Sequence, residues 1–76
     1  MNNKKRESLK DAKMYLERAS NIVSKVLDDE QDCLDNMPEN LQASERYERM
    51  EAAIDKLEEA IEQIDSAKEN IDEASE

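Results

Sequence analysis

Apolar residues recur along the first half of the chain at alternating spacings of three and four residues. The series consists of Leu9, Ala12, Leu16, Ala19, Val23 and Val26, and its phase continues to Cys33 and Met37. This spacing places the series on one face of an α-helix, at positions a and d of a heptad repeat. The pattern predicts an amphipathic helix over about residues 3–35.

The second half repeats the pattern. Its series consists of Tyr47, Met50, Ile54, Leu57, Ile61 and Ile64, lapses at Lys68 and resumes at Ile71. A charged chain that stays disordered has no reason to keep one helical phase over three heptads. A second helix is therefore expected over about residues 44–74.

A short turn over about residues 36–43 separates the two series. Pro38 disfavours helical geometry at the residue before it and lacks a backbone donor, so the first helix should end just before it. Asn36 with Glu39 resembles a capping box, and Ser44 is a second possible N-cap. Because a short connection makes neighbouring helices antiparallel, the expected fold is all-α: an antiparallel two-helix hairpin forming a single domain over residues 1–76.

Composition supports this fold class and limits its stability. The chain has no Gly, one Pro, no Phe and no Trp, and 42% of its residues are charged, which suits helices better than strands. A chain this short rarely gains more than about 3–5 kcal/mol from its own core. The lone Cys33 cannot close an intrachain disulfide. With neither a signal sequence nor a membrane span in the pattern, a cytoplasmic protein is expected.

Residues beside the seam predict how the two helices face one another. In the second helix, position g reads Ala53, Ala60, Ala67 and Ala74. Antiparallel pairing sets these alanines against Tyr15 and Ile22, a large-on-small arrangement that fills space well. On the other flank, a turn near residue 40 brings Arg6 beside Asp72 and Lys13 beside Asp65.

Two leucines on that second flank have no apolar counterpart. Leu27 and Leu34 would meet glutamates or open water in an isolated hairpin. Two apolar side chains left exposed beside a small core indicate a surface that contacts another molecule. We therefore expect these two residues to form an oligomer interface, with a homodimer completing a four-helix bundle.

Carboxylates form a continuous stripe along the second helix. This acidic ridge occupies positions b and e and consists of Glu48, Glu51, Asp55, Glu58, Glu62, Asp65, Glu69 and Asp72. No basic residue interrupts it, although like charges at this spacing cost about 0.2–0.5 kcal/mol per pair. It could be a solubilising face, a docking surface for a basic protein, or an imitation of a nucleic acid backbone. One charge per roughly 5 Å is sparse beside duplex DNA, with one per about 1.7 Å.

A second acidic group lies before the turn. This turn-side cluster consists of Asp28, Asp29, Glu30, Asp32 and Asp35. A calcium-binding loop starting at Asp28 would need glycine where Cys33 stands, and the helical phase runs through the segment. A partner-binding acidic patch is therefore favoured over a metal site.

The residues needed for most chemistry are missing. No His is available to activate Cys33, and no glycine-rich loop can hold a phosphate. Carboxylates on an exposed helix lack the burial that tunes a pKa for acid–base catalysis. A basic surface with interleaved aromatics is also missing. We expect no enzymatic activity, no cofactor and no direct binding of nucleic acid.

The segment from Asp29 to Gln42, followed by Ser44 to Glu48, resembles small acidic helical proteins of phages and mobile elements in Firmicutes. The resemblance implies an accessory protein of the kind that often binds and blocks a host factor, including CRISPR and other defence components. It carries over no functional residue.

Binding is thus the leading hypothesis: the acidic surface blocks or sequesters a basic host protein, with an anti-defence role as one form of it. The first alternative is a structural or regulatory homo-oligomer in which the acid only aids solubility. The second is an oligomeric sponge for a small ligand such as a signalling nucleotide. That alternative requires basic residues from several copies to converge, namely Lys4, Lys5, Arg6, Lys10 and Lys13.

Overall fold

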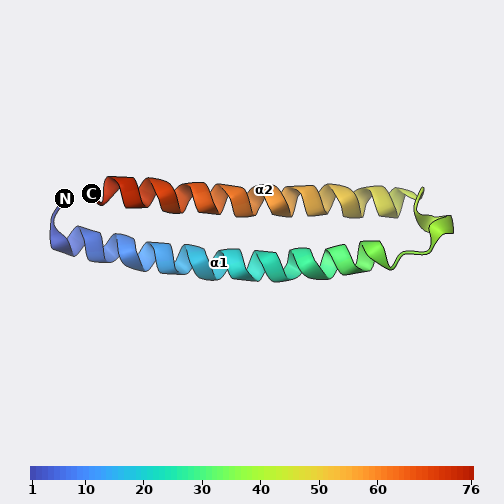
Figure 1. Ribbon diagram of the computed structural model, residues 1–76, viewed down its shortest axis with the longest axis horizontal. Helices are drawn as coiled ribbons and strands as arrows, with labels where there is room; N and C mark the ends of the chain where they lie inside the picture. Colours follow the sequence, from blue (N-terminus) through green and yellow to red (C-terminus); the bar gives the residue numbers. More distant parts are fainter.

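The chain folds into two long antiparallel helices that lie side by side (Figure 1). The computed structural model describes residues 1–76 and contains α1 (Asn3–Asp35), a short 3-10 helix η1 (Glu39–Leu41) and α2 (Glu45–Ala74). The hairpin measures 59 × 15 × 12 Å, and both termini lie at the end opposite the turn (Figure 1). The prediction of an all-helical chain with two packed helices is confirmed.

Side-chain caps set the helix ends. At the start of α1, Asn2 Oδ1 accepts a hydrogen bond from the Lys5 amide at 2.8 Å. At the start of α2, Ser44 Oγ accepts one from the Tyr47 amide at 3.2 Å. Both bonds satisfy amides that have no partner inside the helix.

Asn36 closes α1 instead of starting a new helix. Its Nδ2 atom donates to the Asp32 carbonyl at 2.8 Å, and its own amide donates to the same carbonyl. Pro38 is extended, with φ −58° and ψ 145°, and it precedes η1 without any side-chain cap. The predicted capping box of Asn36 with Glu39 is therefore wrong, because Asn36 is used at a helix C-terminus.

The connection sets the register of the two helices. Across the hairpin, Lys13 pairs with Asp72 and Lys68 pairs with Glu17. Both pairs are symmetric about a point between residues 42 and 43, whereas the sequence suggested a turn near residue 40. The connecting segment, residues 36–44, is almost as long as predicted, but its midpoint differs from that of the paired residues, so the two helices are staggered along their length. The predicted pairing of Lys13 with Asp65 is wrong by one heptad for this reason.

The face by which α1 contacts α2 changes along its length. In the first half the residues shielded from solvent include Leu9 and Leu16 at position a with Ala12 and Ala19 at position d. In the second half they include Leu27 and Leu34 at position e. A straight α-helix drifts by about 20° per heptad relative to a strict seven-residue repeat. That drift carries position e into the seam. Leu34 is only 8% exposed and Leu27 is half-buried, so the expectation that both lie outside the hairpin as an oligomer interface is wrong.

The same drift carries other apolar residues out of the seam. Val26, at position d, is 46% exposed, and Cys33 one heptad later is also exposed. Tyr15 and Ile22 are 63% and 66% exposed. The alanines of α2 therefore do not cover these two side chains, and the predicted large-on-alanine packing is wrong.

A hairpin of two helices leaves its core shallow. Only Ser20, Leu34 and Ile54 are buried, and no large side chain is fully enclosed. The accessible surface is 5941 Å², whereas a compact monomer of this mass exposes about 4,800 Å². The isolated hairpin thus retains roughly 1,200 Å² more surface than a globular chain of its size.

Truncation of the seam should identify the residues that hold the hairpin together. We expect Ile54→Ala to lower the free energy of unfolding by about 2–4 kcal/mol, because it removes the most buried apolar side chain. Met14→Ala, at a position that is 46% exposed, should change it by no more than about 0.5 kcal/mol. Urea titration followed by circular dichroism at one chain concentration measures both. Equal losses in the two variants would contradict this seam.

Candidate docking surface

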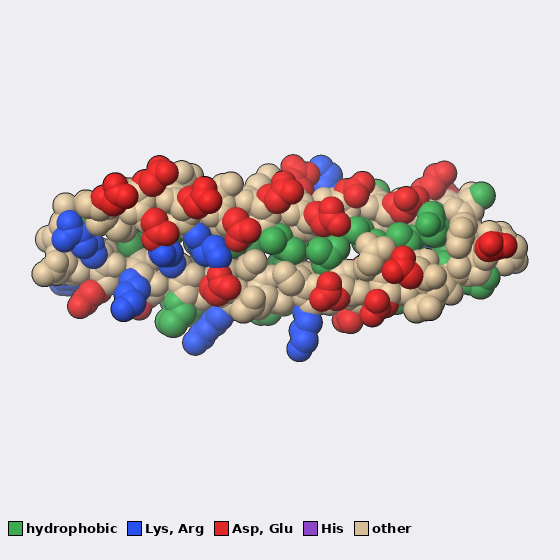
Figure 2. Space-filling view, viewed as in Figure 1, with side chains coloured by type: hydrophobic (Ala, Val, Ile, Leu, Met, Phe, Trp, Pro, Cys, Tyr) green, Lys and Arg blue, Asp and Glu red, His purple; other side chains and the backbone are tan.

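The acidic ridge runs along α2, and all eight of its residues are exposed. Figure 2 shows carboxylates along α2 and over the turn-side part of α1, with apolar side chains visible between the helices. Lysine and arginine side chains in this view lie mostly toward the end that holds the termini. The sums of charge agree: residues 1–25 carry seven basic and three acidic side chains, and residues 26–76 carry four and eighteen.

Charge is segregated around the circumference of α2. Its eleven carboxylates all lie at positions b, e and f of the heptad. The opposite flank, at positions c and g, contains none and is formed by Arg46, Arg49, Ala53, Lys56, Ala60, Gln63, Ala67, Asn70 and Ala74. One helix therefore presents a continuous anionic side and a side without any anion.

Basic residues neutralise only the terminal end of the ridge. Asp72 pairs with Lys13 of α1, and Asp65 pairs with Lys68 at 3.4 Å. The other six ridge residues form no ion pair: Glu48, Glu51, Asp55, Glu58, Glu62 and Glu69. Most of the ridge is therefore free to interact with an external cation or cationic side chain.

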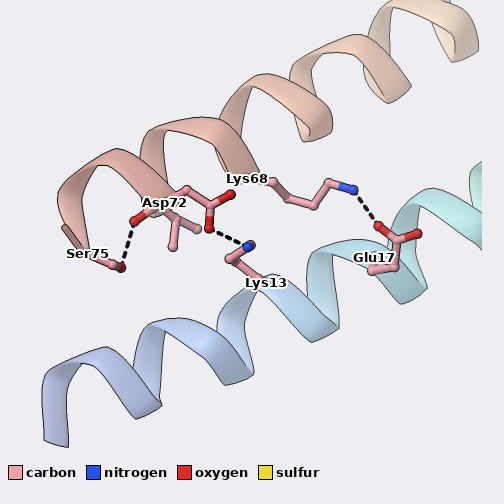
Figure 3. A network of polar contacts seen from close by, with 6 residues as sticks. Lys13, Glu17, Lys68, Asp72 and Ser75 are labelled. Carbon is pink, nitrogen blue, oxygen red and sulfur yellow. Dashed lines mark hydrogen bonds and ion pairs between the residues drawn. The ribbon is translucent and has the colours of Figure 1, made fainter. Parts of the chain in front are cut away.

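Lys68 explains the lapse in the apolar series of α2. It stands at a seam position with 23% of its side chain exposed, and its ammonium binds Glu17 of α1 (Figure 3). It also binds Asp65 of its own helix. The hydrogen bond that it donates to Glu17 raises the pKa of Lys68 above its usual value, and Asp65 adds to the effect. Desolvation by the neighbouring helix opposes this rise.

Arg6 compensates for a missing charge at the end of α2. The last turn of α2 has no basic residue, although cations there interact favourably with the free carbonyls and the helix dipole. The Nε atom of Arg6, from the first turn of α1, donates to the Ser75 carbonyl at 2.9 Å. The sequence suggested that Arg6 would lie beside Asp72. In the structure Arg6 instead binds a backbone carbonyl.

The turn-side cluster is separate from the ridge and lies on α1. Asp28, Asp29, Asp32 and Asp35 are exposed, and Glu30 is half-buried. The helix is continuous through all five, so the calcium-loop alternative lacks its loop. No group of three or more potential metal ligands lies close enough to hold an ion.

Other possible sites contain little that could act on a ligand. Cys33 is a free, exposed thiol in a chain without His. A shallow depression between the helices near the termini contains Lys10, Lys13 and Lys68, but the last two already bind carboxylates. Neither helix has the length of apolar sequence needed to cross a membrane.

Comparison with known proteins identifies no relative. No protein-family model matches the chain, and no curated protein and no solved structure matches it either.

Two features of this surface go beyond the sequence-based prediction. The carboxylate-free c/g flank could have been found from the same heptad assignment that revealed the ridge, because it requires only reading the other side of the helix. The ion pair of Lys68 with Glu17 could not have been found from the sequence, because the two residues meet only in the observed register.

The ion pairs of Lys68 should make stability depend on pH in the alkaline range. Its raised pKa means that the folded chain holds this proton more tightly than the unfolded chain. The stabilisation is therefore present at lower pH and is lost as pH rises through the folded pKa. We expect the melting temperature to fall more steeply between about pH 10 and 12 in the native chain than in Lys68→Met.

The Lys68→Met variant is a suitable control because it keeps both tyrosines, which titrate in the same range. Thermal melts followed by circular dichroism give the two slopes. Parallel slopes would show that Lys68 is not coupled to folding.

Proposed function

We propose that this chain is a non-enzymatic binding protein whose acidic ridge docks against a basic surface of another protein. The observation that carries the proposal is that six of eight ridge carboxylates are exposed and without an ion pair. Like charges on one helix face reduce helix stability, so an unneutralised stripe of this length is a cost that binding a cationic surface would relieve.

The geometry of the ridge suits a protein surface. Its residues lie on one continuous helix, spaced over about 36 Å with one charge per roughly 5 Å. A rigid helix holds these charges at fixed separations, which favours orientation and rapid capture of a complementary partner.

Blocking is the mode of action that we propose. A protein that binds nucleic acid or phosphate presents a basic surface, and a bound acidic hairpin would occupy that surface. The resemblance of residues 29–48 to phage and mobile-element proteins suggests the context: a cytoplasmic accessory protein that sequesters a host factor, including a defence component.

We also propose that the hairpin acts as a homodimer arranged as a four-helix bundle. Its large accessible surface of 5941 Å² and its few buried residues support association, because small cores commonly need it. The same observation favours the second candidate function, a structural or regulatory homo-oligomer in which the ridge serves only solubility.

Charge reversal should separate these functions. We expect the triple variant Asp55→Lys, Glu58→Lys, Glu62→Lys to lose at least tenfold in affinity for any protein that the native chain retains from its host, because these three carboxylates have no internal partner. Binding of the native chain should also weaken steeply with salt. Affinity is measured by titrating the identified partner against immobilised chain.

A matched control is the triple variant Glu7→Lys, Glu39→Lys, Glu76→Lys, which changes net charge equally at three exposed carboxylates that lie outside the ridge and form no ion pair. It should keep affinity within about threefold, since additive surface effects are small. Similar losses of affinity in both variants would show that binding depends on net charge and not on the ridge. Unchanged affinity in the ridge variant would exclude the ridge as the docking surface.

A further inference from the structure

Four exposed residues of α1 form a stripe outside the hairpin seam. Tyr15, Ile22, Val26 and Cys33 follow one another at spacings of seven, four and seven residues, which keeps them on one face of the helix. The first three are 63%, 66% and 46% exposed, and Cys33 is exposed as well. We call these four residues the α1 stripe.

The spacing of the α1 stripe is the same read in either direction. Its centre is residue 24, with Tyr15 and Cys33 equally far from it and Ile22 and Val26 equally far from it. Two copies of such a stripe can pair in antiparallel orientation about a two-fold axis, because an isologous interface needs a self-complementary surface. Tyr15 then faces Cys33 of the second copy, and Ile22 faces Val26 of the second copy.

The neighbouring flank of α2 permits the same symmetry. The pairs Lys13–Asp72 and Glu17–Lys68 place residue 24 level with residue 61. The c/g flank of α2 is there centred on Ala60, with Ala53 and Ala67 on either side. Small side chains let two helices approach closely, and the flank contains no carboxylate to repel its copy.

Beside the α1 stripe, one basic residue lies level with acidic residues across this axis. Arg18 lies on the outer edge of the stripe, with its guanidinium 5.9 Å from the centre of the Tyr15 ring. Antiparallel pairing about residue 24 places Arg18 level with Asp29 and Asp32 of the second copy, both of which are exposed and have no ion pair in the hairpin. Lys25 also borders the stripe, and pairing about residue 24 places it close to Lys25 of the second copy, so only part of this edge is complementary.

The available area is that of a stable dimer. The broad face of the hairpin measures 59 × 15 Å, or about 900 Å², and a standard interface buries about 800 Å² on each partner. This is comparable with the roughly 1,200 Å² by which the surface of the hairpin exceeds that of a compact chain.

We propose that a second copy of this chain packs on the α1 stripe, with the two α1 helices antiparallel and crossing at residue 24. This inference rests on the proposed homodimer and assigns its contact surface. The acidic ridge lies on the opposite flank of α2 and stays exposed. The dimer therefore displays two ridges on opposite faces.

One test compares two glutamate substitutions by molar mass. We expect Ile22→Glu to weaken dimerisation by about a hundredfold or more, because the two-fold axis buries the new charge twice. Met14→Glu places the same charge at a nearby position that is 46% exposed and off the stripe. It should leave the dimer intact. Light scattering over a concentration series gives the dissociation constants, and circular dichroism reports helix content.

A second test detects the contact directly, through a covalent link between two copies. Tyr15→Cys adds a second thiol to the chain, and a short bismaleimide should link this introduced thiol of one copy to Cys33 of the other. Within one chain the two thiol positions are separated by about 27 Å along α1, too far for the reagent. The native chain, with Cys33 alone, and Met14→Cys should give little covalent dimer. The products are resolved on a denaturing gel.

The outcomes distinguish the two proposals. A native chain that is monomeric at all concentrations would overturn both the homodimer and this contact surface. A native dimer that survives Ile22→Glu, or that fails to link through Tyr15→Cys, would retain the homodimer and overturn the α1 stripe. Neither result bears on docking by the acidic ridge, which the charge-reversal variants test separately.

Discussion

Two helices lying side by side share a single seam, and this constraint governs the rest of the molecule. Each helix can cover only one side of the other, so even the best placed apolar residue, Ile54, remains 5% exposed. The seam cannot follow one heptad position for more than a few turns, because an α-helix does not repeat every seven residues. Leu34 consequently enters the seam while Val26 leaves it. The same shift of the contact face therefore buries some apolar residues and exposes others.

Charge organises the ends of the hairpin differently. The first turn of α1 is basic and has no acidic residue, which is unfavourable for an isolated helix because its N-terminus carries partial positive charge. In the antiparallel arrangement one of these basic residues, Arg6, binds the Ser75 carbonyl at the C-terminal end of α2. At the turn end no ion pair joins the two helices, and the acidic side chains of α1 accumulate there. The unequal distribution leaves most of the ridge unneutralised.

The sequence predicted elements well and register poorly. Periodicity defines two helices because amphipathic patterns extend over many turns, and Ser44 marks the start of α2 through an ordinary capping interaction. The role of Asn36 was mistaken, because the same side chain can cap either end of a helix. The register was not predicted, because it depends on how far one helix is staggered along the other, and the apolar periodicity within each helix does not determine that stagger. The ridge could be predicted from the heptad assignment alone. The exposure of Tyr15 could not, because the helix face in contact with α2 shifts relative to a strict seven-residue repeat.

The separation in sequence between paired residues also determines the order in which contacts form as the hairpin folds. Near the turn, Gln42 binds the carbonyl of Met37 only five positions away, whereas Lys13 and Asp72 are 59 positions apart. Closing a long loop costs more entropy than closing a short one, so the helices join from the turn outward and the ion pairs near the termini form last. Contacts made after the rate-limiting step affect mainly the rate of unfolding. Loss of one of these ion pairs should therefore shorten the lifetime of the folded hairpin while leaving its rate of formation nearly unchanged.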